Sequence, residues 1–230
     1  PRAPLSNQLN LGELYPPKRG DEHRVANRSD FKKIEVGALI AGGGIAGSAL
    51  FRYMADSGLN PVLVNADRGS SWRNIGGGRT AFSLPELAEI AEHNHAIFKE
   101  LQKMSNIDYK TTRYINLAHD EATFNALDAS RAWSDAYMVD PKNFQKEISP
   151  YFSTKSKRYL GALITNDCWQ ATPGKVVDLI RNMGISSGGR IVEDCKVLEV
   201  MKEGSTYCIL VLTHDKKYVE FRTEIFVNAL

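Results

Sequence analysis

The stretch Glu35-Val-Gly-Ala-Leu-Ile-Ala-Gly-Gly-Gly-Ile-Ala-Gly-Ser-Ala-Leu50 joins a short apolar run to the motif Gly42-x-Gly44-x-x-Gly47 and then to a helical pattern. We expect Gly42 to let the chain turn off a strand, Gly44 to leave room for phosphates, and Gly47 to let the helix pack closely on the sheet. Amides at the N-terminus of that helix would face an anion. The stretch therefore predicts a turn that binds the pyrophosphate of a dinucleotide.

The residues around the motif support this interpretation. Residues 36–40 form the apolar run expected of a buried parallel strand, and residues 61–65 read as a second strand. Gly58 is placed to end the intervening helix in a left-handed turn. Apolar residues recur at helical spacing after the motif, namely Ile45, Ala49, Leu50, Tyr53 and Met54. The alternative is a structural glycine turn without a ligand.

Composition excludes several classes of protein. The chain has 230 residues, of which 43% are hydrophobic and 24% charged, as in ordinary globular proteins. Its net charge of +2, with both signs interspersed, favours a small-molecule ligand over nucleic acid or a membrane surface. No stretch has the length of a membrane span or the layout of a signal peptide, so we expect a cytoplasmic location.

Cysteine and histidine spacing gives no reason to expect a metal site. Cys168, Cys195 and Cys208 are odd in number and widely separated, which predicts buried thiols rather than disulfides or zinc ligands. His93 and His95 lie two residues apart on a predicted helix, so they point in different directions and are expected to be solvated.

The chain divides into four predicted segments. Residues 1–33 resemble an extended arm, 34–107 the first segment of a nucleotide-binding domain, 108–165 a substrate-facing segment with short strands, and 166–230 the second segment of the nucleotide-binding domain. Within the first segment, a capping box at Ser83-Leu-Pro-Glu86 predicts the start of a helix. Its expected apolar stripe comprises Leu87, Ile90, Ala91, Ile97, Phe98 and Leu101.

The last segment begins with a helix and continues with strands. Thr172 and Pro173 supply an N-cap and a first-turn proline, and Gly184 is expected to end the helix. Its buried face is predicted to contain Val176, Val177, Ile180 and Met183. Three strand-like runs, Val197–Met201, Tyr207–Leu212 and Glu220–Val227, are expected to return to the first layer.

Four segments taken in this order resemble the D-amino-acid oxidase (DAO) family of FAD-dependent amine oxidoreductases, which includes sarcosine and glycine oxidases. They are the Gly42–Gly47 motif, Ser71-Trp-Arg-Asn-Ile-Gly-Gly77, Leu160–Ile164 with Thr172-Pro173, and Phe226-Val-Asn-Ala229. The resemblance covers about 34–230. It implies an α/β fold: a Rossmann-like FAD-binding domain of the GR2 type with an inserted, partly antiparallel α+β substrate domain, and with the C-terminal part of the fold absent.

The resemblance also implies which residues bind FAD. They include the pyrophosphate loop, the ribose-binding end of the second strand, a second loop near the diphosphate and flavin, and an adenine contact at Val197. The full set is Gly42, Gly44, Ile45, Ala46, Gly47, Asn65, Ala66, Asp67, Ser71, Arg73, Asn74, Gly76, Gly77 and Val197. The planar fork of Arg73 suits phosphate oxygens. We expect FAD to be noncovalent, and we assign no catalytic side chain.

One position departs from the family pattern. The second strand of the family usually ends in an acid that binds the adenosine ribose, whereas this chain has Asn65. Replacing a charge-assisted hydrogen bond with a neutral one costs about 1 kcal/mol, or roughly fivefold in affinity. Asp67 is an alternative ribose ligand, and Arg68 near a neutral Asn65 would also suit the 2′-phosphate of NADP.

The activity implied by the resemblance is dehydrogenation of an amine or amino acid to an imine, with hydride passing to the flavin. One alternative is an NADP-dependent reductase, motivated by Asn65 and Arg68. Another is a non-catalytic nucleotide-binding or assembly subunit, motivated by the stop at Leu230 and the long N-terminal arm, with a second chain or a missing C-terminal half as partner. An enzyme acting on an aminomethyl group of modified RNA is a further alternative, which the near-neutral charge disfavours.

Overall fold

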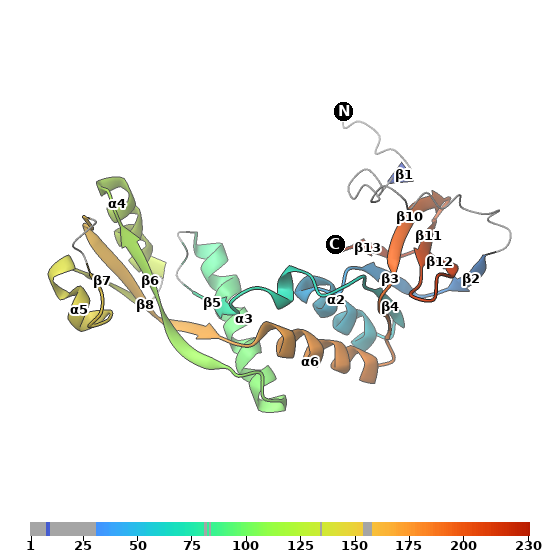
Figure 1. The fold of residues 1–230 in the computed structure, drawn as a ribbon, viewed down its shortest axis with the longest axis horizontal. Helices are drawn as coiled ribbons and strands as arrows, with labels where there is room; N and C mark the ends of the chain where they lie inside the picture. Colours follow the sequence, from blue (N-terminus) through green and yellow to red (C-terminus); the bar gives the residue numbers. More distant parts are fainter. Residues whose placement is uncertain (1–7, 10–30, 81, 83, 134, 154–157) are drawn as a thin grey trace. The chain divides into compact units, whose positions relative to one another are not determined.

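The computed structural model of the chain describes residues 8–9, 31–80, 82, 84–133, 135–153 and 158–230. It contains two compact units. The first comprises residues 1–74 and 177–230, and the second is the continuous segment 75–176 inserted between them. Figure 1 shows the elements of both.

A parallel sheet carries the glycine motif of the first unit. Its strands are β3 (Ala38–Ala41), β4 (Pro61–Val64), β9 (Arg190–Val192) and β13 (Phe226–Asn228), in the spatial order β13-β3-β4-β9. Helix α2 (Ile45–Asp56) connects β3 to β4, and every residue of those two strands is buried. The predicted β-α-β unit is therefore confirmed.

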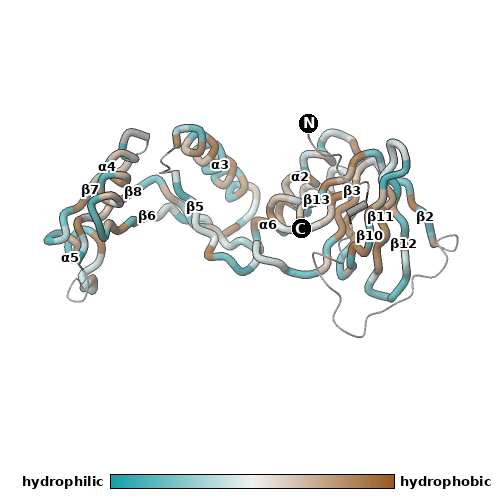
Figure 2. The backbone as a smooth tube through the Cα atoms, turned by 90° about the horizontal axis from the view of Figure 1, so that it is seen from above, coloured by the Kyte–Doolittle hydropathy of each residue, from teal (hydrophilic) through white to brown (hydrophobic). Residues whose placement is uncertain are grey.

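A second, mixed sheet completes the first unit. It has the order β1-β10-β11-β12-β2, from strands β1 (Gln8–Leu9), β10 (Lys196–Glu203), β11 (Thr206–Leu212), β12 (Tyr218–Thr223) and β2 (Lys32–Glu35). Apolar side chains of both sheets form one core. That core includes Leu39, Val62, Val200, Ile209 and Phe221, and the tube in Figure 2 is mostly hydrophobic along β3 and β11.

An antiparallel sheet forms the centre of the second unit. Its long strands β6 (Lys110–Ala118) and β8 (Gly161–Gln170) pair along most of their length, and β5 (Gly77–Gly78) and β7 (Ala136–Val139) also pair with β8. The helices are α3 (Pro85–Met104), α4 (Glu121–Ala129) and α5 (Phe144–Glu147). Short 3₁₀ turns are η3 (Ser130–Trp133) and η4 (Pro141–Asn143), while η2 (Ser70–Trp72) belongs to the first unit. This agrees with the antiparallel character expected from the sequence.

The buried face of α2 differs from the predicted stripe. Gly47, Ser48, Phe51 and Ala55 are buried, whereas Ile45, Leu50 and Tyr53 are 38–54% exposed. Close packing of Gly47 on the sheet fixes the rotation of the helix about its axis. The residues on the same face as Gly47, such as Phe51, are therefore buried. Gly58 ends the helix at φ +77°, as expected.

Helix α3 also corrects the sequence interpretation. Its N-cap is Leu84, with no side-chain cap, rather than a capping box at Ser83, which lies outside the described residues. Leu87 and Ile90 are 43% and 57% exposed, and the buried positions include Ala91, His95 and Leu101. The apolar stripe was therefore only partly right.

Helix α6 (Pro173–Ser186) begins where predicted but runs past Gly184. The left-handed residue after the helix is Gly188, at φ +94°. A Cβ atom at Gly184 would lie 2.5 Å from the ring of Phe51, so this glycine is needed for close packing on α2 rather than for termination.

The ends of the chain differ from expectation in two respects. Most of the predicted arm, 1–33, lies outside the described residues, but Gln8–Leu9 pair with β10, and Lys32–Lys33 belong to β2. The predicted strand Glu220–Val227 is two strands, β12 and β13, which lie in different sheets. Only β13 returns to the first layer.

The predicted segment boundaries do not coincide with the two units. The second unit runs from Ile75 to Val176, and both the 107/108 and 165/166 boundaries fall inside it. Helix α3 thus belongs to the same compact unit as β6 and β8. The assignment of segments to FAD and substrate stays a prediction.

Candidate functional site

The glycine loop lies at the carboxyl end of β3. Gly42 has φ +107°, which a residue with a side chain rarely adopts, and its N–H donates to the carbonyl of Val64. A Cβ atom at Gly47 would overlap the carbonyl oxygen of Gly42. Both glycines therefore serve the turn and the close helix contact that the motif predicts.

The first amides of α2 lie at the same end of the sheet. The N–H of Ile45 donates to the hydroxyl of Ser71 at 3.0 Å, which brings the second predicted loop to the glycine motif. Within the described part of the chain, the N–H groups of Gly44, Ala46 and Gly47 have no acceptor. Unpaired donors at a helix N-terminus favour an anionic ligand.

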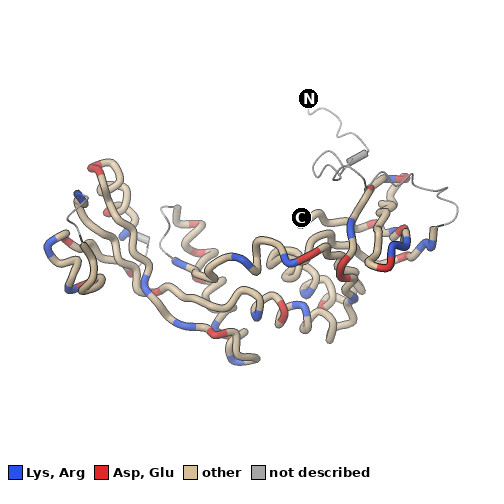
Figure 3. Tube along the Cα trace, in the orientation of Figure 1, with Lys and Arg blue, Asp and Glu red and all other residues tan. Residues whose placement is uncertain are grey.

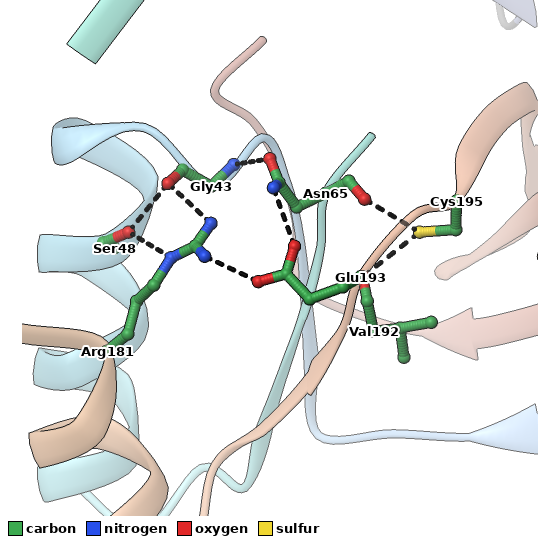
Figure 4. Close-up of polar contacts among 7 residues, drawn as sticks. All are labelled: Gly43, Ser48, Asn65, Arg181, Val192, Glu193 and Cys195. Atoms are coloured by element: carbon green, nitrogen blue, oxygen red, sulfur yellow. Dashed lines mark hydrogen bonds and ion pairs between the residues drawn. The ribbon is translucent and has the colours of Figure 1, made fainter. Parts of the chain in front are cut away.

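Asn65 connects the glycine loop to a neighbouring carboxylate (Figure 4). Its Oδ1 accepts from the N–H of Gly43 at 3.1 Å, and its Nδ2 donates to Oε2 of Glu193 at 2.8 Å. Asn65 is 7% exposed, whereas the Glu193 side chain is 47% exposed. Asn65 is therefore used inside the protein, and Glu193 reaches toward solvent.

Arg181 holds the other side of this network. It donates to Oε1 of Glu193 at 2.6 Å, to the carbonyl of Gly43 at 2.8 Å and to the hydroxyl of Ser48 at 3.2 Å. Its side chain is 9% exposed, so the guanidinium is buried, and its three hydrogen-bond partners fix the conformation of the glycine loop.

Trp72 adds a second buried donor to the region. The guanidinium of Arg181 lies 5.0 Å from the centroid of its ring. Its Nε1 is buried and has no hydrogen-bond partner among the described residues. An unpaired buried donor is costly, and a ligand that accepts from it would remove that cost.

The remaining predicted FAD-binding residues of the first unit are in several environments. Ala66, Asp67 and Arg73 are exposed. Asn74 is also exposed and donates to the carbonyl of Ser71. Val197 is half-buried against the core between the two sheets. Their roles toward FAD stay predictions.

Gly76 and Gly77 belong to the second unit. Gly76 has φ +69°, and a Cβ atom there would overlap the carbonyl of Ala171. Gly77 pairs with Gln170 at the end of β8. This geometry explains a glycine at position 76 through the fold of the second unit itself.

His95 is buried, so the expectation that it is solvated was wrong. It is 2% exposed, its ring stacks on Trp169 at 4.4 Å between centroids, and its Nε2 lies 2.6 Å from the hydroxyl of Tyr109. Nδ1 lies 3.2 Å from Oδ1 of Asp167. Because both ring nitrogens have polar partners, the imidazole can be buried. The spacing of apolar residues along the helix does not predict this. His93 is exposed, as expected.

The three cysteines are free and buried, as predicted. Burial raises the pKa of the Cys168, Cys195 and Cys208 thiols. Over the described ranges, no group of three or more His, Cys, Asp or Glu residues could hold a metal ion. No helix there is long and apolar enough to cross a membrane. Figure 3 shows charges of both signs interspersed along the trace.

Sequence reasoning missed Arg181 and Glu193. A signal for the first exists, since Val177, Arg181 and Gly184 lie on one face of α6, which puts a charge on a buried stripe. A signal for Glu193 also exists, because it directly follows a strand and so lies at the carboxyl edge of the parallel sheet.

Comparison with known proteins identifies the family. The model of the FAD dependent oxidoreductase family DAO matches residues 38–230. The chain therefore belongs to the DAO family of FAD dependent oxidoreductases.

Individual relatives are distant. The chain is 22% identical over 190 residues to 4-methylaminobutanoate oxidase (formaldehyde-forming) of Paenarthrobacter nicotinovorans, a match covering 78% of this chain and 23% of that protein. Among solved structures, it is similar to glycine oxidase from Geobacillus kaustophilus, with a TM-score of 0.70, 17% identity and coverage of 85% and 55%. It is also similar to L-proline dehydrogenase from P. horikoshii, with a TM-score of 0.69, 19% identity and coverage of 86% and 53%. The chain thus spans about half the length of those two structures.

The first unit fits the nucleotide part of FAD. Among the described residues, the first amides of α2 have no acceptor and suit a pyrophosphate, and the buried Nε1 of Trp72 has no partner, so a ligand could supply one. Gly42 and Gly43 are buried, whereas Gly44 is half-buried and Ile45 and Ala46 are exposed, so the accessible backbone is the stretch where α2 begins.

Proposed function

We propose that this chain is the FAD-binding part of an oxidoreductase that dehydrogenates a small amine or amino acid to an imine. The observation that carries the proposal is the set of amides at the start of α2 that have no acceptor in the described part of the structure, in a chain that matches the DAO family over residues 38–230. The names of the similar proteins, glycine oxidase and L-proline dehydrogenase, support an amine or amino acid as the substrate class.

Each part of the loop has a proposed role. The N–H groups of Gly44, Ala46 and Gly47 donate to the pyrophosphate, and the helix dipole adds to this attraction. Ser71 accepts a hydrogen bond from Ile45, which supports a position of the second loop beside the start of α2. In the proposed site, Arg73 of this loop contacts the phosphates. Arg73 is exposed and can therefore turn its fork toward a phosphate oxygen.

When bound, FAD supplies the electron acceptor for dehydrogenation of the substrate. The residues of the first unit bind and orient the cofactor rather than move protons at the substrate. Arg181 contributes by holding the carbonyl of Gly43 and the hydroxyl of Ser48, which keeps the loop rigid before the cofactor arrives.

The first test is FAD binding by the full 230-residue chain, followed by absorbance and flavin fluorescence. We expect saturable binding of FAD. The informative variant is Gly44→Ala, because its added methyl lies where the phosphates approach. That methyl would be 2.9 Å from the movable hydroxyl of Ser71, so the fold can adjust. Loss of a phosphate contact worth 1.5–3 kcal/mol predicts an affinity about tenfold or more lower.

Gly69→Ala is the matched control. Gly69 has φ −75°, and no atom of the described residues lies within 4 Å of the position that a Cβ atom would take there. We expect its FAD affinity to equal that of the unmodified chain. A chain that binds no FAD, or equal affinities for both variants, would contradict the proposed site.

A further inference from the structure

In the family pattern, an acidic residue after the second strand binds the ribose. Here that position is Asn65, and an acidic residue, Glu193, follows the neighbouring strand instead. Strand β4 pairs with β9 in parallel, and Val64 is the register partner of Val192. Asn65 and Glu193 directly follow these two partners. They therefore lie side by side at the carboxyl edge of the sheet, next to the glycine loop (Figure 4).

Asn65 itself is poorly placed to bind a ribose. Its Oδ1 is occupied by the N–H of Gly43, its Nδ2 donates to Glu193, and the residue is 7% exposed. These contacts give Asn65 a different role, which is to fix the loop at one end and the Glu193 carboxylate at the other.

Glu193 retains unused hydrogen-bonding capacity. Its oxygens accept one hydrogen bond from Arg181 and one from Asn65, while a carboxylate offers about four acceptor positions. The side chain is 47% exposed, and the contacts at 2.6 Å and 2.8 Å hold it in one orientation. Counting only donors on residues that the structure describes, about two acceptor positions thus remain for a pair of vicinal hydroxyl donors.

We propose that Glu193, oriented by Asn65 and Arg181, binds the 2′- and 3′-hydroxyl groups of the adenosine ribose and selects against a 2′-phosphate. This inference rests on the proposed function. A ribose diol donates to a carboxylate, whereas a phosphate at the 2′ position would place its negative charge against that of Glu193. Glu193 therefore favours FAD over an NADP-like nucleotide at this site.

The test combines one variant with ligands that lack single hydroxyl groups. FAD binding to the full chain is followed by flavin fluorescence, and ADP, 2′-deoxy-ADP and 3′-deoxy-ADP are used as competitors. For the unmodified chain, loss of a hydroxyl that donates to a carboxylate predicts about tenfold weaker competition. In Glu193→Gln, we expect the same deletion to cost less than about threefold, because the acceptor is no longer charged.

Two further comparisons complete the test. Glu203→Gln is the matched control, since Glu203 also accepts from an arginine, Arg222, at 2.8 Å and has a 56% exposed side chain, but lies on β10. It should retain the full hydroxyl penalty. Adenosine 2′,5′-bisphosphate, which differs from AMP only by its 2′-phosphate, should compete at least tenfold less well than AMP with the unmodified chain, and this difference should shrink in Glu193→Gln.

The outcomes separate this inference from the proposed function. If FAD binds, but ADP fails to compete or the deoxy analogues lose the same factor in Glu193→Gln as in the unmodified chain, the ribose assignment is overturned and the FAD site stands. A hydroxyl penalty that falls in Asp67→Asn instead would transfer the role to Asp67. Absence of FAD binding to the unmodified chain would overturn both.

Discussion

At the scale of single residues, the buried thiols give the clearest dependence on pH. Burial raises the pKa of Cys168, Cys195 and Cys208, so the neutral thiols persist above the pH at which exposed cysteines ionise. We expect a thiol-specific reagent at pH 8 to label the native chain at least tenfold more slowly than the urea-unfolded chain. Rapid labelling of all three in the native state would contradict this.

The same thiols affect stability. In the unfolded chain they lose protons near their ordinary pKa of about 8.5, whereas the folded chain keeps them to higher pH. The folded state thus binds more protons in that window, and its free energy of unfolding falls as pH rises above about 8.5. Urea denaturation at pH 7.5 and 9.5 measures this fall. A stability that rises over the same interval would contradict the sign.

The sequence predicts the glycine loop well because each glycine is required by backbone geometry within a few residues of it. Gly42 requires positive φ, and Gly47 lies against the carbonyl of Gly42 five residues earlier. Arg181 and Glu193 could not be predicted in the same way, since their partners Gly43 and Asn65 are more than a hundred residues away along the chain. Their roles depend on which strands become neighbours.

At the scale of elements, the contact between α2 and α6 depends on Gly184. Alanine is favoured over glycine by about 1 kcal/mol inside a helix. Here the added methyl would lie 2.5 Å from the ring of Phe51, which is fully buried and has little freedom to move. We therefore expect Gly184→Ala to lower the free energy of unfolding by about 1–3 kcal/mol, as measured by urea denaturation.

Gly69→Ala serves as the comparison, because it adds the same methyl at a position that no described atom approaches within 4 Å. Its stability should stay within about 0.5 kcal/mol of the unmodified chain. A Gly184→Ala variant as stable as this control would refute the packing role and restore helix termination as the reason for the glycine.

Helices were predicted better in position than in orientation. The starts of α2 and α6 follow from glycine and proline signals, which act locally. The inward face of each helix depends instead on its partner: Gly47 turns α2 toward the sheet, and His95 turns inward on α3 because Tyr109 and Asp167 supply polar partners. Apolar spacing alone does not contain that information.

At the scale of the whole molecule, the two units have separate cores. Phe144 is fully buried in the core of the second unit, together with Val139, Ala162 and Ile164. We expect Phe144→Ala to destabilise that unit by about 3–5 kcal/mol, because it leaves a large cavity. Affinity for ADP, which the first unit is proposed to bind, should change less than twofold at 25 °C.

Calorimetry and ADP competition on the same variant provide the measurement. If one part of the heat-absorption curve moves to a lower temperature while the affinity for ADP is unchanged, the two units unfold independently. A parallel loss of ADP affinity would mean that the first unit needs an intact second unit. His93→Ala is a suitable control, since His93 is exposed in the same unit and its loss should leave both readouts unchanged.

The insertion of one unit into the other also has a consequence during synthesis. Strand β3 meets β4 soon after translation, but its other neighbour, β13, begins only at Phe226, and β2 must wait for β12 at Tyr218. Ribosomes add about 5–20 residues per second, so the apolar strand β3 and the more polar strand β2 lack these partners for on the order of ten seconds or more. The nascent chain therefore has an extended period in which one edge of the sheet that later carries the glycine loop is open to pairing with another chain.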